Sequence, residues 1–486
     1  MKNKKSGSFV KQLFGYSLSS WISCIIGFVS VPIVTNLFLP EELGKINLYN
    51  SYLNLFLSFA YFGMDQTYAR FYNDPPGNND KKSIFTVCIS ISLITTFIIS
   101  AGILMFSDMI SEKIIGYPSF TVAVILIFGI VAHLVLRFLN LASRMQKNLL
   151  LYSVQAITIT VITKLSYIVV AFWKAEGIYA ILVIGASFTV AALIFFFIKY
   201  KSVMSRKADW SSDSVKTVLK YGVPLIPATA FAILNNNLPQ IYIREYTDFA
   251  TVGIYSNAAN IASIITIIQS GFQNFWGPFV YENYKTKNGL IIKVHHIISV
   301  AMVAMGICIC IGQPLIYAIL VGKNYQSSAH LFPFLLLSPI CYTISETLGI
   351  GIRLENKTYW NVVTYFITFV VNTGLCLLLL PRIGVVGGAV ASATSAIAML
   401  AVKAFIGERY YRCSDGYLRL VIIIAVMVAT AVINYVLYDS AWKYAVFVLA
   451  LVIVLLVYFK EVKYVTLYTV KLFKKFLKKG GTSDNA

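Results

Sequence analysis

Charged side chains inside long apolar segments are the residues of this sequence best suited to bind a ligand. Lys164 stands about 14 residues into an expected helix, roughly 21 Å along its axis, which is past the middle of a bilayer. A charge at that depth is costly unless it faces water or a partner. Lys164 is therefore the first candidate for binding an anionic ligand in a cavity, and a structural ion pair is the alternative.

Four more residues of this kind lie on two other apolar segments. His133 and Arg137 are four residues apart and share one helix face. An interior histidine with satisfied hydrogen bonds is the alternative for His133, and contact with lipid headgroups is the alternative for Arg137. Asp65 and Arg70 close an earlier segment, either as cleft residues or as a pair that marks the helix end.

The remaining candidates are one carboxylate and a set of amides. Glu346 is expected to pair with a cation, bind a proton or take part in ion coupling. Because the basic candidates outnumber the acidic ones, the cavity favours an anionic ligand such as a diphosphate. Interhelical hydrogen bonding is the alternative for the amides. The amides expected to line the cleft are Asn235, Asn236, Asn237, Gln240, Gln269 and Gln273.

Fourteen apolar segments carry these side chains, from Phe14–Leu37 to Trp442–Phe459, and hydrophobic residues make up 58% of the chain. Each segment is close to the ~20 residues that cross a bilayer as a helix. The sequence predicts an all-α polytopic membrane protein with 14 transmembrane helices. The polar segments are too short for a catalytic domain, and no metal, cofactor or catalytic motif has a suitable context. We therefore expect no enzyme activity, cofactor or metal.

The net charge of +20 is distributed as in a membrane protein. Most of the 40 Lys and Arg fall in alternate gaps between the apolar segments, which is the bias of cytoplasmic loops. This predicts a multi-pass protein of a plasma membrane with both termini in the cytoplasm. The excess charge then serves topology and contact with anionic lipids rather than nucleic-acid binding. The seven Cys are scattered, as expected for small packing residues.

The two halves of the chain share short motifs. Gly44 corresponds to Gly253 and Arg144 to Arg353, at an offset of about 207 residues that also aligns other motifs. The expected architecture is two parallel six-helix repeats around a central cleft, with two further helices. The expected parts are an N-terminal lobe (12–200), a cytoplasmic linker (201–220), a C-terminal lobe (221–407), two helices (417–459) and a basic cytoplasmic tail (460–486).

Taken in order, four motifs resemble the polysaccharide repeat-unit flippases (Wzx-like) of the MOP exporter superfamily. They are Leu39–Gly44, Tyr221–Pro227, Val252–Ser256 and Pro381–Ala389, and the resemblance extends over nearly the whole chain. It implies alternating-access export of an undecaprenyl-diphosphate-linked oligosaccharide from the inner to the outer leaflet of a bacterial plasma membrane, for cell-surface polysaccharide assembly. Bacterial membrane lipids and a downstream polymerase are the other implied partners.

One departure and several alternatives accompany this resemblance. Many relatives carry an Asp-Arg pair where this chain has Pro239-Gln240, so that pair is not carried over. A lipid II flippase or a multidrug or cation antiporter is the alternative within the superfamily, although drug exporters typically lack the last two helices. A polysaccharide polymerase or ligase would need a larger outer loop. Because the sequence has no nucleotide-binding motif, we expect the membrane potential to drive transport, with Glu346 as a modulator. Obligate ion antiport is the alternative.

Overall fold

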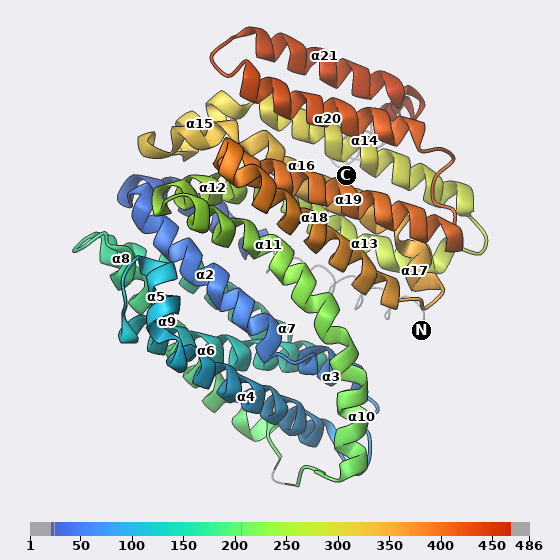
Figure 1. The fold of residues 1–486 in the computed structure, drawn as a ribbon. Coiled ribbons are helices and arrows are strands. Elements are labelled where there is room, and N and C mark those ends of the chain that lie inside the picture. The colour runs from blue at the N-terminus through green and yellow to red at the C-terminus, as the bar shows by residue number, and fades with distance from the viewer. Residues whose placement is uncertain (1–20, 24, 206, 468–486) are drawn as a thin grey trace, which may run out of the picture.

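The protein is helical throughout its described length. The computed structural model describes residues 21–23, 25–205 and 207–467, and every regular element among them is a helix (Figure 1). The predicted all-α fold class is thus confirmed. The start of the expected N-terminal lobe (12–20), residue 206 of the expected linker and the end of the expected tail (468–486) lie outside the described residues.

The N-terminal half begins with a short apolar helix, Trp21–Leu37. Asp80 starts α4 by accepting the backbone N–H groups of Lys82 and Ser83 at 3.1 and 2.7 Å, donors that a helix start leaves unpaired. The bonds with Ser83 hold the pKa of the Asp80 carboxyl below its ordinary value. The helices are α2 (Pro40–Ala60), α3 (Met64–Phe71), α4 (Lys81–Met105), α5 (Ser107–Ile115), α6 (Phe120–Met145), α7 (Leu149–Leu165), α8 (Ile168–Ala171) and α9 (Gly177–Val203).

A linker helix, α10 (Ser212–Gly222), leads into the C-terminal half. The Asn79 side chain donates to Ser214 Oγ at 2.6 Å and so ties α10 to the loop before α4. The elements that follow are η1 (Val223–Leu225), α11 (Ile226–Tyr246), α12 (Phe249–Ala262), η2 (Ser263–Ile265), α13 (Thr266–Asn283), α14 (Asn288–Ile311), α15 (Gln313–Leu320), η3 (Lys323–His330), α16 (Phe332–Leu348), α17 (Ile350–Leu354), α18 (Tyr359–Ile383), α19 (Val385–Tyr410), α20 (Leu418–Val436) and α21 (Trp442–Val457).

The described residues do not confirm the expected count of fourteen membrane spans. Among the described residues, ten helices are long and apolar enough to cross a membrane, and up to twelve if each bent pair counts as one span. The count of fourteen is therefore not confirmed. One reason is that α2 is 21 residues long but carries Glu41, Glu42 and Lys45 near its start and several asparagines further on, so it is more polar than a lipid-facing helix.

The two halves repeat one another in their helix starts. Helices α2 and α12 begin 209 residues apart, α4 and α14 begin 207 apart, and α9 and α19 begin 208 apart. These spacings agree with the offset expected from the sequence motifs. Figure 1 shows the N-terminal helices on one side, the C-terminal helices on the other, and α2 beside α11 and α12 where the two lobes meet.

The lobes are in close contact at one end, which we call the closed end. There α2 crosses α12 so tightly that a Cβ on Gly44 would collide with the carbonyl oxygen of Phe249, and one on Gly253 with that of Pro40. Small residues of this kind allow two helices to approach closely. The Tyr325 hydroxyl adds a bond to the carbonyl of Phe38 at 2.9 Å. The opposite end, where α3, α10 and α17 lie in Figure 1, is the linker end.

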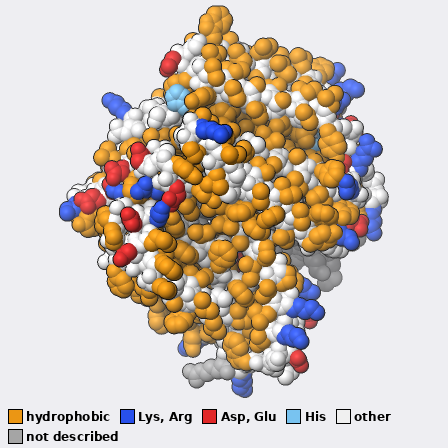
Figure 2. Space-filling model, in the orientation of Figure 1, with side chains coloured by type: hydrophobic (Ala, Val, Ile, Leu, Met, Phe, Trp, Pro, Cys, Tyr) orange, Lys and Arg blue, Asp and Glu red, His pale blue; other side chains and the backbone are white. Residues whose placement is uncertain are grey.

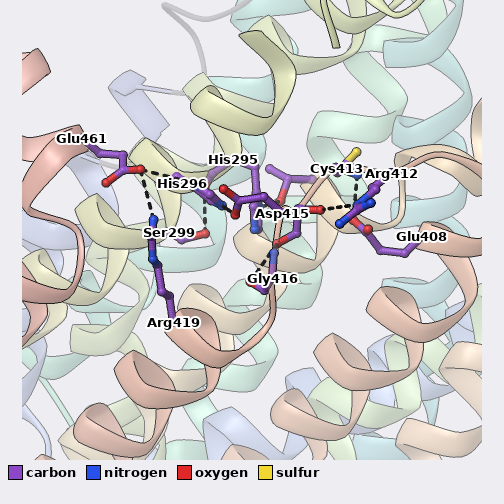
Figure 3. A network of polar contacts seen from close by, with 12 residues as sticks. His295, His296, Ser299, Glu408, Arg412, Cys413, Asp415, Gly416, Arg419 and Glu461 are labelled. Atoms are coloured by element: carbon purple, nitrogen blue, oxygen red, sulfur yellow. Dashed lines mark hydrogen bonds and ion pairs between the residues drawn. The ribbon is translucent and has the colours of Figure 1, made fainter. Parts of the chain in front are cut away.

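Helices α20 and α21 follow the last pair of helices that share the repeat spacing, and a polar network fastens them to α14 (Figure 3). His296 of α14 is only 3% exposed, and its Nε2 lies 3.0 Å from Asp415 Oδ1 in the loop before α20. Its Nδ1 lies 3.4 Å from Glu461 Oε1 beyond α21, and that oxygen lies 3.5 Å from Nη1 of Arg419. One histidine therefore joins three segments that are distant in the sequence.

Candidate functional site

Lys164 lies where the two lobes meet. It is carried by α7, and its Nζ donates to Asn260 Oδ1 of α12 at 3.2 Å. The surrounding pocket of about 40 Å³ has room for water but not for a sugar in this conformation. Asparagines and hydroxyl side chains line it, and no described Asp or Glu does. The lysine thus has a neutral hydrogen-bond partner, and the carboxylate that a structural ion pair requires is not among the residues around it.

A stripe of asparagines on α2 faces this region and was not recognised in the sequence. Asn47 and Asn50 line the Lys164 pocket, and Asn54 Nδ2 donates to Asn237 Oδ1 of α11 at 3.4 Å. Their spacing of three and four residues places them on one helix face. Such a polar stripe in a segment otherwise rich in Leu and Phe is the sequence signal that could have identified them.

Arg137 and Asp65 form an ion pair within the N-terminal lobe. Arg137 Nη2 lies 3.1 Å from Asp65 Oδ2, and the Asp65 side chain is 8% exposed whereas that of Arg137 is 48% exposed. The expected helix-end pair of Asp65 with Arg70 is not formed, because α6 brings Arg137 to α3 while the exposed Arg70 stacks on the Phe71 ring at 5.5 Å. Arg137 keeps an open face for an anion.

His133 has the contacts of an interior histidine. Its Nδ1 lies 2.9 Å from the carbonyl oxygen of Gly129, and its ring centroid lies 3.8 Å from that of Phe188 on α9. Both contacts are within the N-terminal lobe. The geometry supports the alternative reading of this residue over a role in the cleft.

Glu346 is held by two cations in the C-terminal lobe. Its Oε1 lies 2.6 Å from Lys403 Nζ of α19, and its Oε2 lies 2.5 Å from Arg353 Nη2 of α17. The Lys403 side chain is 3% exposed and that of Glu346 14%. The expectation that this carboxylate pairs with a cation agrees with this geometry. Lys403 itself was missed, since its position near the end of an apolar segment resembles that of a loop residue.

A second, larger cavity of about 450 Å³ lies among α11, α12, α13, α16, α18 and α19. Asn235, Asn236 and Gln269 line it, as three of the amides expected at the cleft. Asn235 accepts from Asn372 Nδ2 at 2.9 Å through both its side-chain and its backbone oxygen, which supports interhelical bonding for this residue. No charged side chain is among the described residues that line this cavity.

The other expected amides lie elsewhere. Gln240 Oε1 accepts from Ser51 Oγ of α2 at 2.7 Å, and Asn237 bonds to Asn54, so both lie at the contact between the lobes. Gln273 lies on α13 and lines neither cavity. Most of the expected site residues are therefore divided among the Lys164 pocket, the α2–α11 contact, the Arg137–Asp65 pair, the Glu346 cluster and the C-terminal cavity, whereas Arg70, His133 and Gln273 lie in none of these places.

Two helical lobes, with ten to twelve helices among the described residues that are long and apolar enough to cross a membrane, define a polytopic membrane protein. The chain belongs to the polysaccharide biosynthesis protein family, whose profile matches residues 9–274. This confirms, at the level of the family, the resemblance found in the sequence. A relative in Haemophilus influenzae, the Lsg locus protein 1, is 23% identical over 293 residues, which cover 58% of this chain and 68% of that protein.

Solved transporter structures share the fold. The lipid II flippase MurJ in its inward closed conformation matches with a TM-score of 0.63 at 15% identity, covering 94% of this chain and 99% of that chain. An inward-facing multidrug resistance MATE family transporter of the MOP superfamily matches with a TM-score of 0.53 at 15% identity, covering 79% and 94%. At this identity the likeness shows the fold alone.

Proposed function

We propose that this protein is a flippase that moves a lipid-diphosphate-linked oligosaccharide repeat unit from the inner to the outer leaflet of a bacterial plasma membrane by alternating access. Lys164 binds the diphosphate, and Arg137 assists it. Membership of the polysaccharide biosynthesis protein family and the transporter fold support this proposal.

Lys164 is the observation that carries the proposal. A cation in the interior needs a partner or water, and here it faces an amide in a polar pocket between the lobes. Because charge-assisted bonds to phosphate oxygens are stronger than bonds to an amide, an incoming diphosphate can replace Asn260 as the partner. The position between two lobes exposes the bound cargo to each side in turn as the lobes move.

The orientation in the membrane is part of the proposal. Figure 2 shows Lys and Arg gathered along the side where the α10, α13 and α17 ends lie, whereas acidic side chains are mixed with basic ones near the closed end. By the positive-inside rule, we expect the linker end and both termini in the cytoplasm. In this orientation the conformation is closed to the outside.

The membrane potential supplies the driving force in this proposal. Moving two negative charges outward across an inside-negative potential of ~100 mV is favourable by roughly 4–5 kcal/mol. Glu346 is held by Lys403 and Arg353, which supports a modulating role rather than one as a free proton carrier. In proteoliposomes, flipping should follow a valinomycin-set potential; flipping that ignores it and stops when a proton or Na⁺ gradient collapses would instead support ion antiport.

Export assays test the role of Lys164. Lys164→Ala should abolish surface polysaccharide at normal protein abundance, and Lys164→Arg should retain part of it, because the cation is kept with a different shape. Lys174→Ala, which removes an exposed cation, is the control. Wild-type export by Lys164→Ala would refute the assignment. If this protein instead rescues cells that lack a lipid II flippase, lipid II rather than a repeat unit would be the cargo.

Cysteine labelling tests the topology. In a cysteine-free background, Ser327→Cys should react with a membrane-impermeant reagent from outside, and Lys207→Cys only after the membrane is opened. Both residues are exposed. The reverse pattern would reject the proposed orientation.

A further inference from the structure

We propose that the cavity of the C-terminal lobe binds the uncharged sugar part of the cargo, while Lys164 holds its charged part. This inference rests on the proposed flippase function and adds the chemical class of the ligand at a second position. The cavity of about 450 Å³ falls within the roughly 300–1,000 Å³ of typical ligand pockets.

The chemistry of the cavity wall fits a neutral polyhydroxy compound. Its described polar groups are amides and hydroxyls, which both donate and accept hydrogen bonds as sugar hydroxyls do. Tyr342 and Tyr365 contribute aromatic rings, whose faces suit the C–H faces of a sugar ring. A cavity for an anion or a cation would instead present a charged side chain, and none of the described residues on its wall carries one.

One amide on the wall has hydrogen-bonding capacity that the folded chain does not use. Gln269 Oε1 is buried and has no hydrogen-bond partner among the described residues. A buried acceptor left without a partner is destabilising, because the bond that it made to water is lost and not replaced. A ligand hydroxyl that donates to Gln269 Oε1 would remove this cost.

The charged cluster of the C-terminal lobe supports the cavity from behind. Lys403 Nζ lies 5.3 Å from the Tyr342 ring centroid and 5.7 Å from that of Tyr365, so the cation faces the tyrosines that line the cavity. Glu346 and Arg353 hold the other side of this cluster. Lys403 is thus a positioning residue for the two rings.

Helix α12 connects the two parts of the proposed site. Asn260 of α12 bonds Lys164, whereas Ser263, three residues later at the start of η2, lines the C-terminal cavity and is exposed. Residues three apart on a helix are neighbours, roughly 5–6 Å between their Cβ atoms. Asn236 is also exposed on the cavity wall, which leaves this side open. A cargo with its diphosphate at Lys164 can therefore extend its sugar along α12 into the cavity.

Binding of two defined lipids to the purified full-length protein tests this inference. The probes are undecaprenyl diphosphate and the same lipid carrying one neutral N-acetylhexosamine. Wild-type protein should bind the sugar-bearing lipid about tenfold more tightly, the effect of ~1.4 kcal/mol. Gln269→Leu should remove this preference while leaving the Kd for the sugar-free lipid unchanged. Equal binding of both lipids by the wild type, or an intact preference in Gln269→Leu, would overturn the inference.

Two further measurements separate this result from folding and from the anion site. Gln269→Leu should keep or raise the Tm, because it removes an unpaired buried acceptor. Asn283→Leu on the same helix is the control and should keep the preference, because the side-chain amide of Asn283 donates to the Phe279 carbonyl of its own helix. Lys164→Met should weaken the binding of both lipids by the same factor. If Lys164→Met changes neither Kd, Lys164 is not the anion site. The ratio of the Kd values of the two lipids still tests whether the cavity binds the sugar.

Discussion

Lys164 and Lys403 are both lysines of the helical interior, one in each lobe, and they differ in what they face. Lys403 lies 2.6 Å from a carboxylate that Arg353 also binds, and two tyrosine rings cover it. Lys164 donates to a single amide in a pocket between the lobes. A neutralised buried charge is part of the packing, whereas a cation with only a neutral partner remains available for a ligand.

The largest expected effect comes from breaking the paired cluster. Glu346→Gln leaves Lys403 buried without its carboxylate, which should lower stability by about 3–5 kcal/mol. Thermal unfolding in detergent measures this as a lower Tm. Glu346→Gln combined with Lys403→Met should recover most of the loss, because the uncompensated charge is also removed. An unchanged Tm in the single variant would mean that the cluster does not stabilise the lobe.

Replacing Lys164 should not destabilise the protein, in contrast to the loss of stability expected for Glu346→Gln. Lys164→Met removes a charge that no described carboxylate compensates, so stability should stay the same or rise by about 1 kcal/mol. The same Tm measurement applies, with Lys174→Met as the surface control. A decrease in Tm as large as that of Glu346→Gln would mean that Lys164, like Lys403, has a structural role.

Giving Lys164 a carboxylate partner sharpens the comparison. Asn260→Asp places an acidic oxygen where an amide oxygen now lies 3.2 Å from Nζ. The lysine should then be neutralised like Lys403, and export should fall at least about tenfold at unchanged protein abundance, the effect of ~1.4 kcal/mol of lost binding. Asn36→Asp, at an exposed position, is the control. Normal export in Asn260→Asp would show that the free charge at position 164 is not needed.

The smallest effects are expected at the Arg137–Asp65 pair, which lies between the two extremes. Because Arg137 is 48% exposed, its pair should contribute only about 0.2–1 kcal/mol to stability. The two variants should affect export differently. Arg137→Gln should reduce export about two- to fivefold, which corresponds to the same energy range. Asp65→Asn should not reduce export, because the arginine is then free to bind cargo. Equal losses in both variants would identify a purely structural pair.

The fold could be predicted from the sequence to the extent that it depends on local pattern. Long apolar segments fix the helices, and the recurrence of Gly44 as Gly253 revealed the repeat. The predicted number of spans is not confirmed among the described residues, because segments such as α2 combine an apolar character with a polar stripe that faces the other lobe.

The candidate site could be predicted only in part, because ion pairing depends on tertiary contacts. Depth in the membrane was enough to select Lys164 and Glu346. The ion-pair partners could not be predicted from local sequence, because Lys403 lies 57 residues after Glu346 and Arg137 lies 72 residues after Asp65. The C-terminal cavity likewise collects side chains from six helices, so no local motif marks it.

The reciprocal glycine contact at the closed end has the symmetry of a contact between identical subunits. Gly44 meets the backbone at Phe249, and Gly253 meets it at Pro40, so each half offers the other the same surface. This is the self-complementary contact that a two-fold symmetric dimer makes. The two halves of this single polypeptide thus close on one another through an interface of the kind that joins the two subunits of a homodimer.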